Sequence, residues 1–181
     1  MYQQNSKSTI DGRTTEDLFQ KSAANHYWNA IKADTQDDKY NGIDFYIRAG
    51  ALNHSVQVKG PRRVGRNDQE YSTEFTWLEL KNVAGGSGSL LKETTFTALY
   101  MPWVKKFILF PTKELREYVI AHINYNKAPL TNKHGIVEWD RYTRSNYGKS
   151  DEIVLISYNS LREFYTIYLE EYDPSLLIFD V

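Results

Sequence analysis

The sequence predicts a mixed α/β fold in a single domain. Its 181 residues are close to the size of one domain, for which about 150 residues is typical. Hydrophobic residues make up 41% of the chain and charged residues 25%, a balance that favours a packed core over a disordered chain. Segments with helical hydrophobic spacing alternate with short strand-like segments, an order that indicates a mixed α/β architecture.

Three helices are expected, and the last of them is short. The first covers about residues 15–32, because two threonine hydroxyls precede two carboxylates in Thr14-Thr15-Glu16-Asp17, as at a capped helix start. Its apolar residues recur near helical spacing at Leu18, Phe19, Ala23, Tyr27 and Ile31. The second covers about 111–122, and the last begins at 159 and reaches about 165.

Strands are expected where β-branched and aromatic residues gather between turn residues. Segments 43–47 and 55–58 are predicted to form a hairpin with its turn near Gly50 and Asn53. Further strands are expected at 74–80, 94–100, 106–110 and 153–157. The segment 124–149 has little hydrophobic periodicity apart from a short run at 135–139.

Composition excludes several classes of protein and of site. Lys and Arg total 22 against 23 Asp and Glu, so any binding of a polyanion must depend on a local basic patch. The absence of Cys excludes disulfides, cysteine zinc sites and thiol nucleophiles, and the scattered histidines form no zinc-binding pattern. The polar N-terminus and the short apolar runs predict neither a signal peptide nor a membrane span, so we expect a cytoplasmic protein.

Three polar residues are expected to converge at the hairpin. Asp44 opens the first strand, and Gln57 and Lys59 lie two residues apart on the second, so they share one of its faces. A hard divalent cation takes oxygen ligands, and Mg²⁺ commonly binds one or two carboxylates together with waters and substrate phosphate. A neighbouring lysine can orient water and stabilise the charge that develops during phosphodiester hydrolysis.

The segments Gly42-Ile43-Asp44 and Gln57-Val58-Lys59 resemble the core of the PD-(D/E)xK nuclease superfamily, in the style of its Mrr-like and Holliday-junction-resolvase-like branches. The resemblance covers about residues 12–110, and Glu16 matches the acidic residue that those nucleases often carry on the first helix. It implies a restriction-endonuclease-like core, a mixed sheet flanked by helices in the order helix–strand–strand–strand–helix–strand. It implies one nuclease-like domain over 1–181, with a core at about 12–123 and a strand–helix extension at about 124–181.

The resemblance also implies roles for individual residues. Asp44 would bind Mg²⁺ or Mn²⁺, Gln57 would supply a neutral oxygen, and the Val58 carbonyl is a further candidate ligand. Glu16 would bind the metal through water or position the attacking water, and Lys59 would activate that water or stabilise the transition state. Gln57 departs from the family pattern, because an acidic residue usually occupies its position.

Two other segments have alternative interpretations. Glu79-Leu80-Lys81 also fits the E-x-K pattern, with Asp44 as its partner if 60–72 is an inserted loop, although we favour Gln57 to Lys59. The glycine-rich 85–89 segment lacks the spacing of a phosphate loop. It is either a flexible connection or a backbone that approaches a phosphate closely.

Two basic segments are candidates for binding DNA, because Lys and Arg neutralise phosphates and aromatic rings stack on unpaired bases. The candidate residues are Arg62, Arg63 and Arg66 in the first segment, and Arg141, Arg144 and Lys149 in the second. Together with the resemblance they predict a metal-dependent deoxyribonuclease. The small size and the Asn-, Tyr- and Lys-rich composition suggest a phage or mobile-element origin, in which case it would act in the host cytoplasm. A nuclease acting on RNA and a catalytically inactive binding protein of the same fold are the alternatives, and a homodimer is one arrangement left open.

Overall fold

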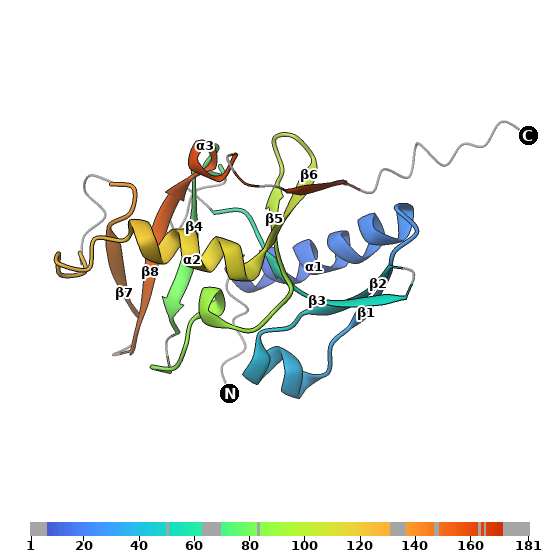
Figure 1. The fold of residues 1–181 in the computed structure, drawn as a ribbon, viewed down its shortest axis with the longest axis horizontal. Helices are drawn as coiled ribbons and strands as arrows, with labels where there is room; N and C mark the ends of the chain where they lie inside the picture. The colour runs from blue at the N-terminus through green and yellow to red at the C-terminus, as the bar shows by residue number, and fades with distance from the viewer. Residues whose placement is uncertain are drawn as a thin grey trace, which may run out of the picture.

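The computed structural model describes residues 7–49, 51–62, 70–82, 84–130, 137–146, 149–162, 164 and 166–171, with side chains for all of these except 7–12, 49, 144–146 and 149. It contains a six-stranded mixed sheet with helices against both faces, and a second, three-stranded sheet beside it (Figure 1). The predicted mixed α/β fold class is therefore confirmed.

The six-stranded sheet has the order β1-β2-β3-β5-β6-β9. Its strands are β1 (Asn29–Lys32), β2 (Phe45–Ala49), β3 (Leu52–Lys59), β5 (Phe96–Met101), β6 (Lys106–Pro111) and β9 (Ile167–Glu170). All neighbouring strands are antiparallel except β3 and β5, which run parallel. The second sheet pairs β4 (Phe75–Lys81), β8 (Lys149–Ser157) and β7 (Arg141–Asn146) in that order, all antiparallel.

Helix α1 (Lys7–Asn25) packs on one face of the six-stranded sheet. Phe19 is fully buried there, with its ring 5.5 Å from that of Phe45 and 5.2 Å from that of Phe107. Val56 and Val58 of β3 belong to the same core, so the residues between and after them, Gln57 and Lys59, face the other way.

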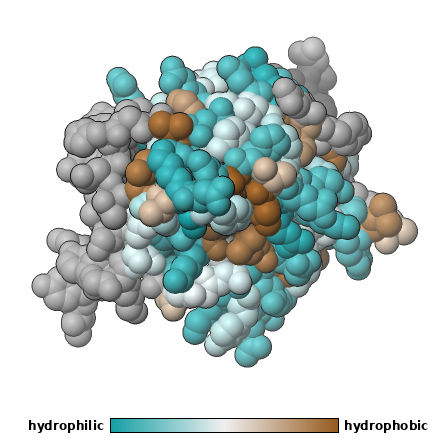
Figure 2. Space-filling model, turned by 60° about the vertical axis from the view of Figure 1, so that its left-hand side comes forward, coloured by the Kyte–Doolittle hydropathy of each residue, from teal (hydrophilic) through white to brown (hydrophobic). Residues whose placement is uncertain are grey.

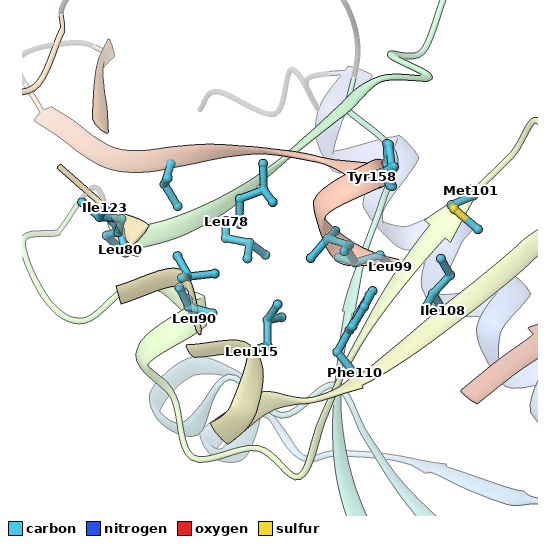
Figure 3. Packing of buried hydrophobic residues seen from close by; sticks show 14 residues of the cluster. Leu78, Leu80, Leu90, Leu99, Met101, Ile108, Phe110, Leu115, Ile123 and Tyr158 are labelled. Carbon is cyan, nitrogen blue, oxygen red and sulfur yellow. The ribbon is translucent and has the colours of Figure 1, made fainter. Parts of the chain in front are cut away.

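The opposite face packs against α2 (Thr112–His122) and the three-stranded sheet. Leu99 and Phe110 from the large sheet, Leu115 from α2 and Leu78 from β4 meet in this second core, as Figure 3 shows. The short helical turns η1 (Asp37–Asn41), η2 (Ser89–Leu91) and α3 (Tyr158–Leu161) complete the described elements. Gln57 and Lys59, at the end of β3 that lies beside Asp44, therefore face the side of the sheet that carries α2.

The predicted first helix needs correction at both ends. It begins at Lys7 rather than near 15 and ends at Asn25 rather than 32, because Tyr27 takes a positive φ of 59° that a helix does not accommodate. The residues that follow form β1, where Ile31 pairs with Tyr46. Tyr27 and Ile31, which helical spacing placed in the core, are 98% and 52% exposed.

The remaining elements agree with the prediction in part. The expected strands are present, but β4 pairs with β8 in the second sheet rather than continuing the hairpin. The order expected from the nuclease resemblance places a helix directly before the last core strand. Here β4 and η2 lie between β3 and its parallel neighbour β5, and α2 follows β6. β7 and β9 were not predicted, and the last helix is a single turn ending at Leu161.

Candidate active site at the ends of β2 and β3

The chain enters β2 through a turn that needs a glycine. Gly42 ends the η1 turn with a φ of +67°, a conformation that side chains rarely accept. A Cβ atom there would lie 2.9 Å from Cγ of Lys92 and 3.0 Å from Nε2 of Gln57. Gly42 therefore lets the backbone approach Gln57 closely, and the turn positions Asp44 at the start of β2.

Asp44 is fixed to β3 by its backbone and by its side chain. Its amide donates to the carbonyl of Val56 at 2.9 Å, and its Oδ2 accepts from the amide of Val58 at 2.6 Å. Because Phe45 pairs with Val56, Asp44 lies across from Gln57. The expected convergence of these two positions is present, and one carboxylate oxygen, Oδ1, is not used by this hydrogen bond.

The surroundings of Asp44 disfavour its charged form. Burial raises the pKa of its carboxyl to about 6, and the nearby charges of Glu16 and Asp38 act in the same direction. The positive charge of Lys59 and the hydrogen bond from the Val58 amide lower the pKa, without cancelling the effect of burial. Asp44 is thus a carboxylate held partly out of water that gains from an added positive charge.

Gln57 carries an unsatisfied polar atom at the same place. Its side chain is only 4% exposed, and its Oε1 has no hydrogen-bond partner within the part of the chain that the structure describes. A buried oxygen without a partner is unfavourable by about 1–3 kcal/mol. Together with the Asp44 carboxylate, this oxygen forms a small set of hard ligands that suits a divalent cation.

Glu16 and Lys32 form the outer part of this cluster. Glu16 Oε2 lies 3.0 Å from Nζ of Lys32, an ion pair between α1 and β1, with the Glu16 side chain 25% exposed. The charges of both residues interact with Asp44. Lys32, Asp38 and Lys92 were missed by sequence reasoning, since only the fold brings them beside Asp44 and Gln57.

The described residues contain no group of three or more His, Cys, Asp or Glu side chains that could hold a metal ion. A metal here would therefore depend on one or two carboxylates, the Gln57 oxygen and backbone carbonyls, with water completing its shell. Val58 directs its amide at Asp44, and the amide and carbonyl of a strand residue point to the same side, so the Val58 carbonyl lies on the Asp44 side of β3.

The predicted DNA-binding residues differ in their burial and contacts, and some lie outside the described part of the chain. Arg62 is half-buried, and its charge acts on the hydroxyl of Tyr158. Arg63 and Arg66 lie outside the described residues, as do the side chains of Arg144 and Lys149 on β7 and β8.

Arg141 makes an ion pair and hydrogen bonds within the protein. Its guanidinium pairs with Glu152 at 3.0 Å and donates to the carbonyls of Tyr125 and Lys127 at 3.3 and 2.9 Å. These bonds tie the loop after α2 to β7. We therefore assign Arg141 a structural role and leave it out of the DNA-binding surface.

The two alternative segments, 79–81 and 85–89, also make hydrogen bonds within the protein. Glu79 accepts a hydrogen bond from the Ser89 amide at 3.3 Å, and its strand belongs to the three-stranded sheet. In the glycine-rich turn the amides of Gly85, Gly86 and Gly88 all donate to other groups of the chain. A Cβ on Gly88 would lie 2.2 Å from the Glu79 carbonyl, so this segment serves close backbone packing.

Comparisons with known proteins give one structural neighbour. No family model and no curated protein matches the sequence. Among solved structures, the chain is similar to a bacterial homing endonuclease, I-Ssp6803I, with a TM-score of 0.45 and 14% sequence identity, over 61% of this chain and 73% of the other. No helix within the described residues is long and apolar enough to cross a membrane.

Proposed function

We propose that this protein is a metal-dependent nuclease that hydrolyses phosphodiester bonds of DNA at the Asp44–Gln57–Lys59 site. The observation that carries the proposal is the buried Oε1 of Gln57, which has no partner in the described structure, next to the half-buried carboxylate of Asp44. Both groups would be satisfied by one divalent cation, which a purely structural pair of residues would not require.

Mg²⁺ or Mn²⁺ fits the donor set of Asp44, Gln57 and the Val58 carbonyl, because all three offer hard oxygen atoms. When bound, the ion would neutralise phosphate charge and lower the pKa of a bound water. Asp44 would hold it through the carboxylate oxygen that Val58 does not use. Gln57 makes the site less negative than a second carboxylate would, so its affinity for the ion should be modest.

Lys59 and Glu16 would orient the attacking water, and Lys59 would also stabilise the phosphate. Lys59 lies on the same face of β3 as Gln57, close enough for its charge to act on Asp44. There it would orient the attacking water and stabilise the added negative charge at phosphorus. Glu16, held by Lys32, would position that water from the α1 side.

DNA would be held by cations beside this site. We assign that contact to Arg62, Arg63 and Arg66, which follow Lys59 in the sequence, with Arg144 and Lys149 as a second group. Replacing Arg62, Arg63 and Arg66 together by Ala should weaken binding of all sequences and flatten the dependence of log affinity on log salt by roughly 2 to 3. An unchanged salt dependence would place the contact elsewhere.

The proposal is tested by incubating purified protein with plasmid, branched, single-stranded and RNA substrates in Mg²⁺, in Mn²⁺ and in EDTA. We expect cleavage of DNA with either metal and none in EDTA, with Asp44→Asn as the inactive control. DNA binding without cleavage under every condition would favour the inactive binding protein, and cleavage of RNA alone would favour the ribonuclease.

A further inference from the structure

A hollow of about 500 Å³ lies between the β5–β6 turn and α3, on the same side of the large sheet as Gln57 and Lys59. Its floor is formed by Met101, Ile108 and Tyr158, which Figure 3 shows together at one end of the buried cluster. Trp103 forms a wall, 38% exposed, with its ring 4.9 Å from that of Tyr158 in an edge-to-face contact. The volume lies within the usual range for small-molecule sites.

The hollow lies beyond the Lys59 end of the proposed active site. Lys59 pairs with Leu99 on β5, and Met101 is two residues further along the same strand. At about 3.3 Å per residue, this is a separation of about 7 Å along the strand. Two base steps of a nucleic acid cover about the same distance. Arg62, three residues after Lys59, lies near enough to Tyr158 in the floor for its charge to lower the pKa of the Tyr158 hydroxyl.

The lining favours a nucleobase. Trp103 offers an aromatic ring for stacking, and Asn159 offers an amide for hydrogen bonds with base edges. Arg162 and Lys106 also line the hollow, with Glu74 as the one acidic residue in the described lining. On the face drawn in Figure 2, apolar patches lie among hydrophilic side chains.

We infer that this hollow binds an unpaired base of the DNA whose phosphate is held at Lys59, so that the nuclease prefers frayed, gapped or branched DNA over intact duplex. The inference rests on the proposed function for the identity of the ligand. Stacking on Trp103 would fix the position of the strand relative to Asp44. The preference would arise because an intact duplex must first unstack a base to fill the hollow.

The test measures binding in EDTA, where the proposed cleavage does not occur. The probes are a duplex with one unpaired 2-aminopurine and the same duplex fully paired. We expect the wild type to bind the unpaired probe more tightly and to quench its fluorescence. Trp103→Ala should lose about tenfold in affinity for the unpaired probe and lose the quenching. Trp103→Phe should keep most of both.

Tyr27→Ala is the matched control, because Tyr27 is 98% exposed and lies at the opposite end of the β1–β2 pair from Asp44. It should bind both probes as the wild type does. Equal binding of both probes by wild type and Trp103→Ala would overturn the inference, even if DNA is cleaved in Mg²⁺. Loss of self-association in Trp103→Ala with unchanged DNA binding would also overturn it. Selective binding of the unpaired probe through Trp103, without cleavage in Mg²⁺, would support the inference and overturn only the nuclease proposal.

Discussion

Two strands of this protein carry nearly the same short pattern in very different surroundings. Gln57-Val58-Lys59 lies on β3, beside the strand that begins after Asp44, and the Gln57 oxygen is buried without a partner in the described structure. Glu79-Leu80-Lys81 lies on β4, pairs with β8, and directs Glu79 to the Ser89 amide. The polar-aliphatic-lysine pattern is thus common to both, and only the neighbouring strand distinguishes them.

This difference shows what makes such a pattern a candidate site. At β3 a half-buried carboxylate lies beside a buried amide oxygen without a partner in the described structure, which is unfavourable unless a ligand compensates for it. At β4 the glutamate is satisfied by the chain itself, so that it stabilises the turn before η2. We expect substitutions at β3 to change activity and metal response, and substitutions at β4 to change stability alone.

The largest effect is expected from Asp44→Asn. Loss of the ligand charge should reduce cleavage by about a hundredfold or more. It should also stabilise the protein at neutral pH in EDTA, because burial holds the pKa of Asp44 near 6 against an ordinary 3.8. That difference of about two units sets an upper limit of about 3 kcal/mol on the gain in unfolding free energy.

The gain in unfolding free energy from Asp44→Asn should increase with pH, and this direction can be measured. A raised pKa means that the folded wild type is penalised as pH rises through 3.8 towards 6, when Asp44 must ionise. The stability difference between Asp44→Asn and wild type should therefore be near zero below pH 4 and full above pH 6. Urea unfolding at pH 4 and pH 7.5 measures it. Full activity in the variant would remove Asp44 from the site.

Lys59→Ala should have the next largest effect. Without the positive charge that lowers it, the pKa of Asp44 should rise further above 6. The variant should lose about 10- to 100-fold in cleavage rate while retaining most of its DNA binding, which we assign to Arg62, Arg63 and Arg66. In thermal unfolding, the pH at which Mg²⁺ begins to raise Tm should move upward relative to wild type. Lys81→Ala, at the matching position of β4, is the control and should leave that pH unchanged.

Much of the six-stranded sheet and the placement of Asp44 follow from local sequence signals. The β2–β3 hairpin was predicted from β-type residues and a glycine turn, and alternation correctly placed Gln57 and Lys59 on one face. The preference for Gln57 over Glu79 rested on spacing, and the structure places only the former next to Asp44. What these residues do chemically remains a proposal.

The errors arise where distant parts of the chain decide the structure. Ile31 fits the helical spacing of α1, but a positive φ at Tyr27 breaks the helix and strand pairing takes over. Ile167-Tyr168-Leu169 is a run of β-forming residues that the sequence analysis did not interpret as a strand, and its pairing with the edge of β6 forms β9.

A smaller change is expected from Gln57→Glu, which converts the β3 segment to the β4 pattern. A second buried carboxylate beside Asp44 should destabilise the protein in EDTA by about 1–3 kcal/mol, because two like charges repel in a poorly solvated place. Mg²⁺ should restore the loss, so the metal-induced rise in Tm should exceed that of wild type. Cleavage should be kept or increased. Loss of activity in Gln57→Glu with retention in Gln57→Ala would show that Gln57 is not a ligand.

The smallest effect is expected from Glu79→Gln, and it tests whether the β4 segment is structural. The amide oxygen of Gln can still accept the hydrogen bond from Ser89, so unfolding free energy should change by less than about 0.5 kcal/mol. Glu79→Ala, which leaves that amide without its acceptor, should lose about 1 kcal/mol. Because β4 pairs with β8 and not with β2, neither variant should change the Mg²⁺ response of Tm or the cleavage rate per folded molecule. Urea unfolding and cleavage assays at saturating Mg²⁺ separate the two readouts. A fall in cleavage as deep as that of Asp44→Asn, in a Glu79→Gln protein of normal stability, would move the catalytic motif from Gln57-Val58-Lys59 on β3 to Glu79-Leu80-Lys81 on β4.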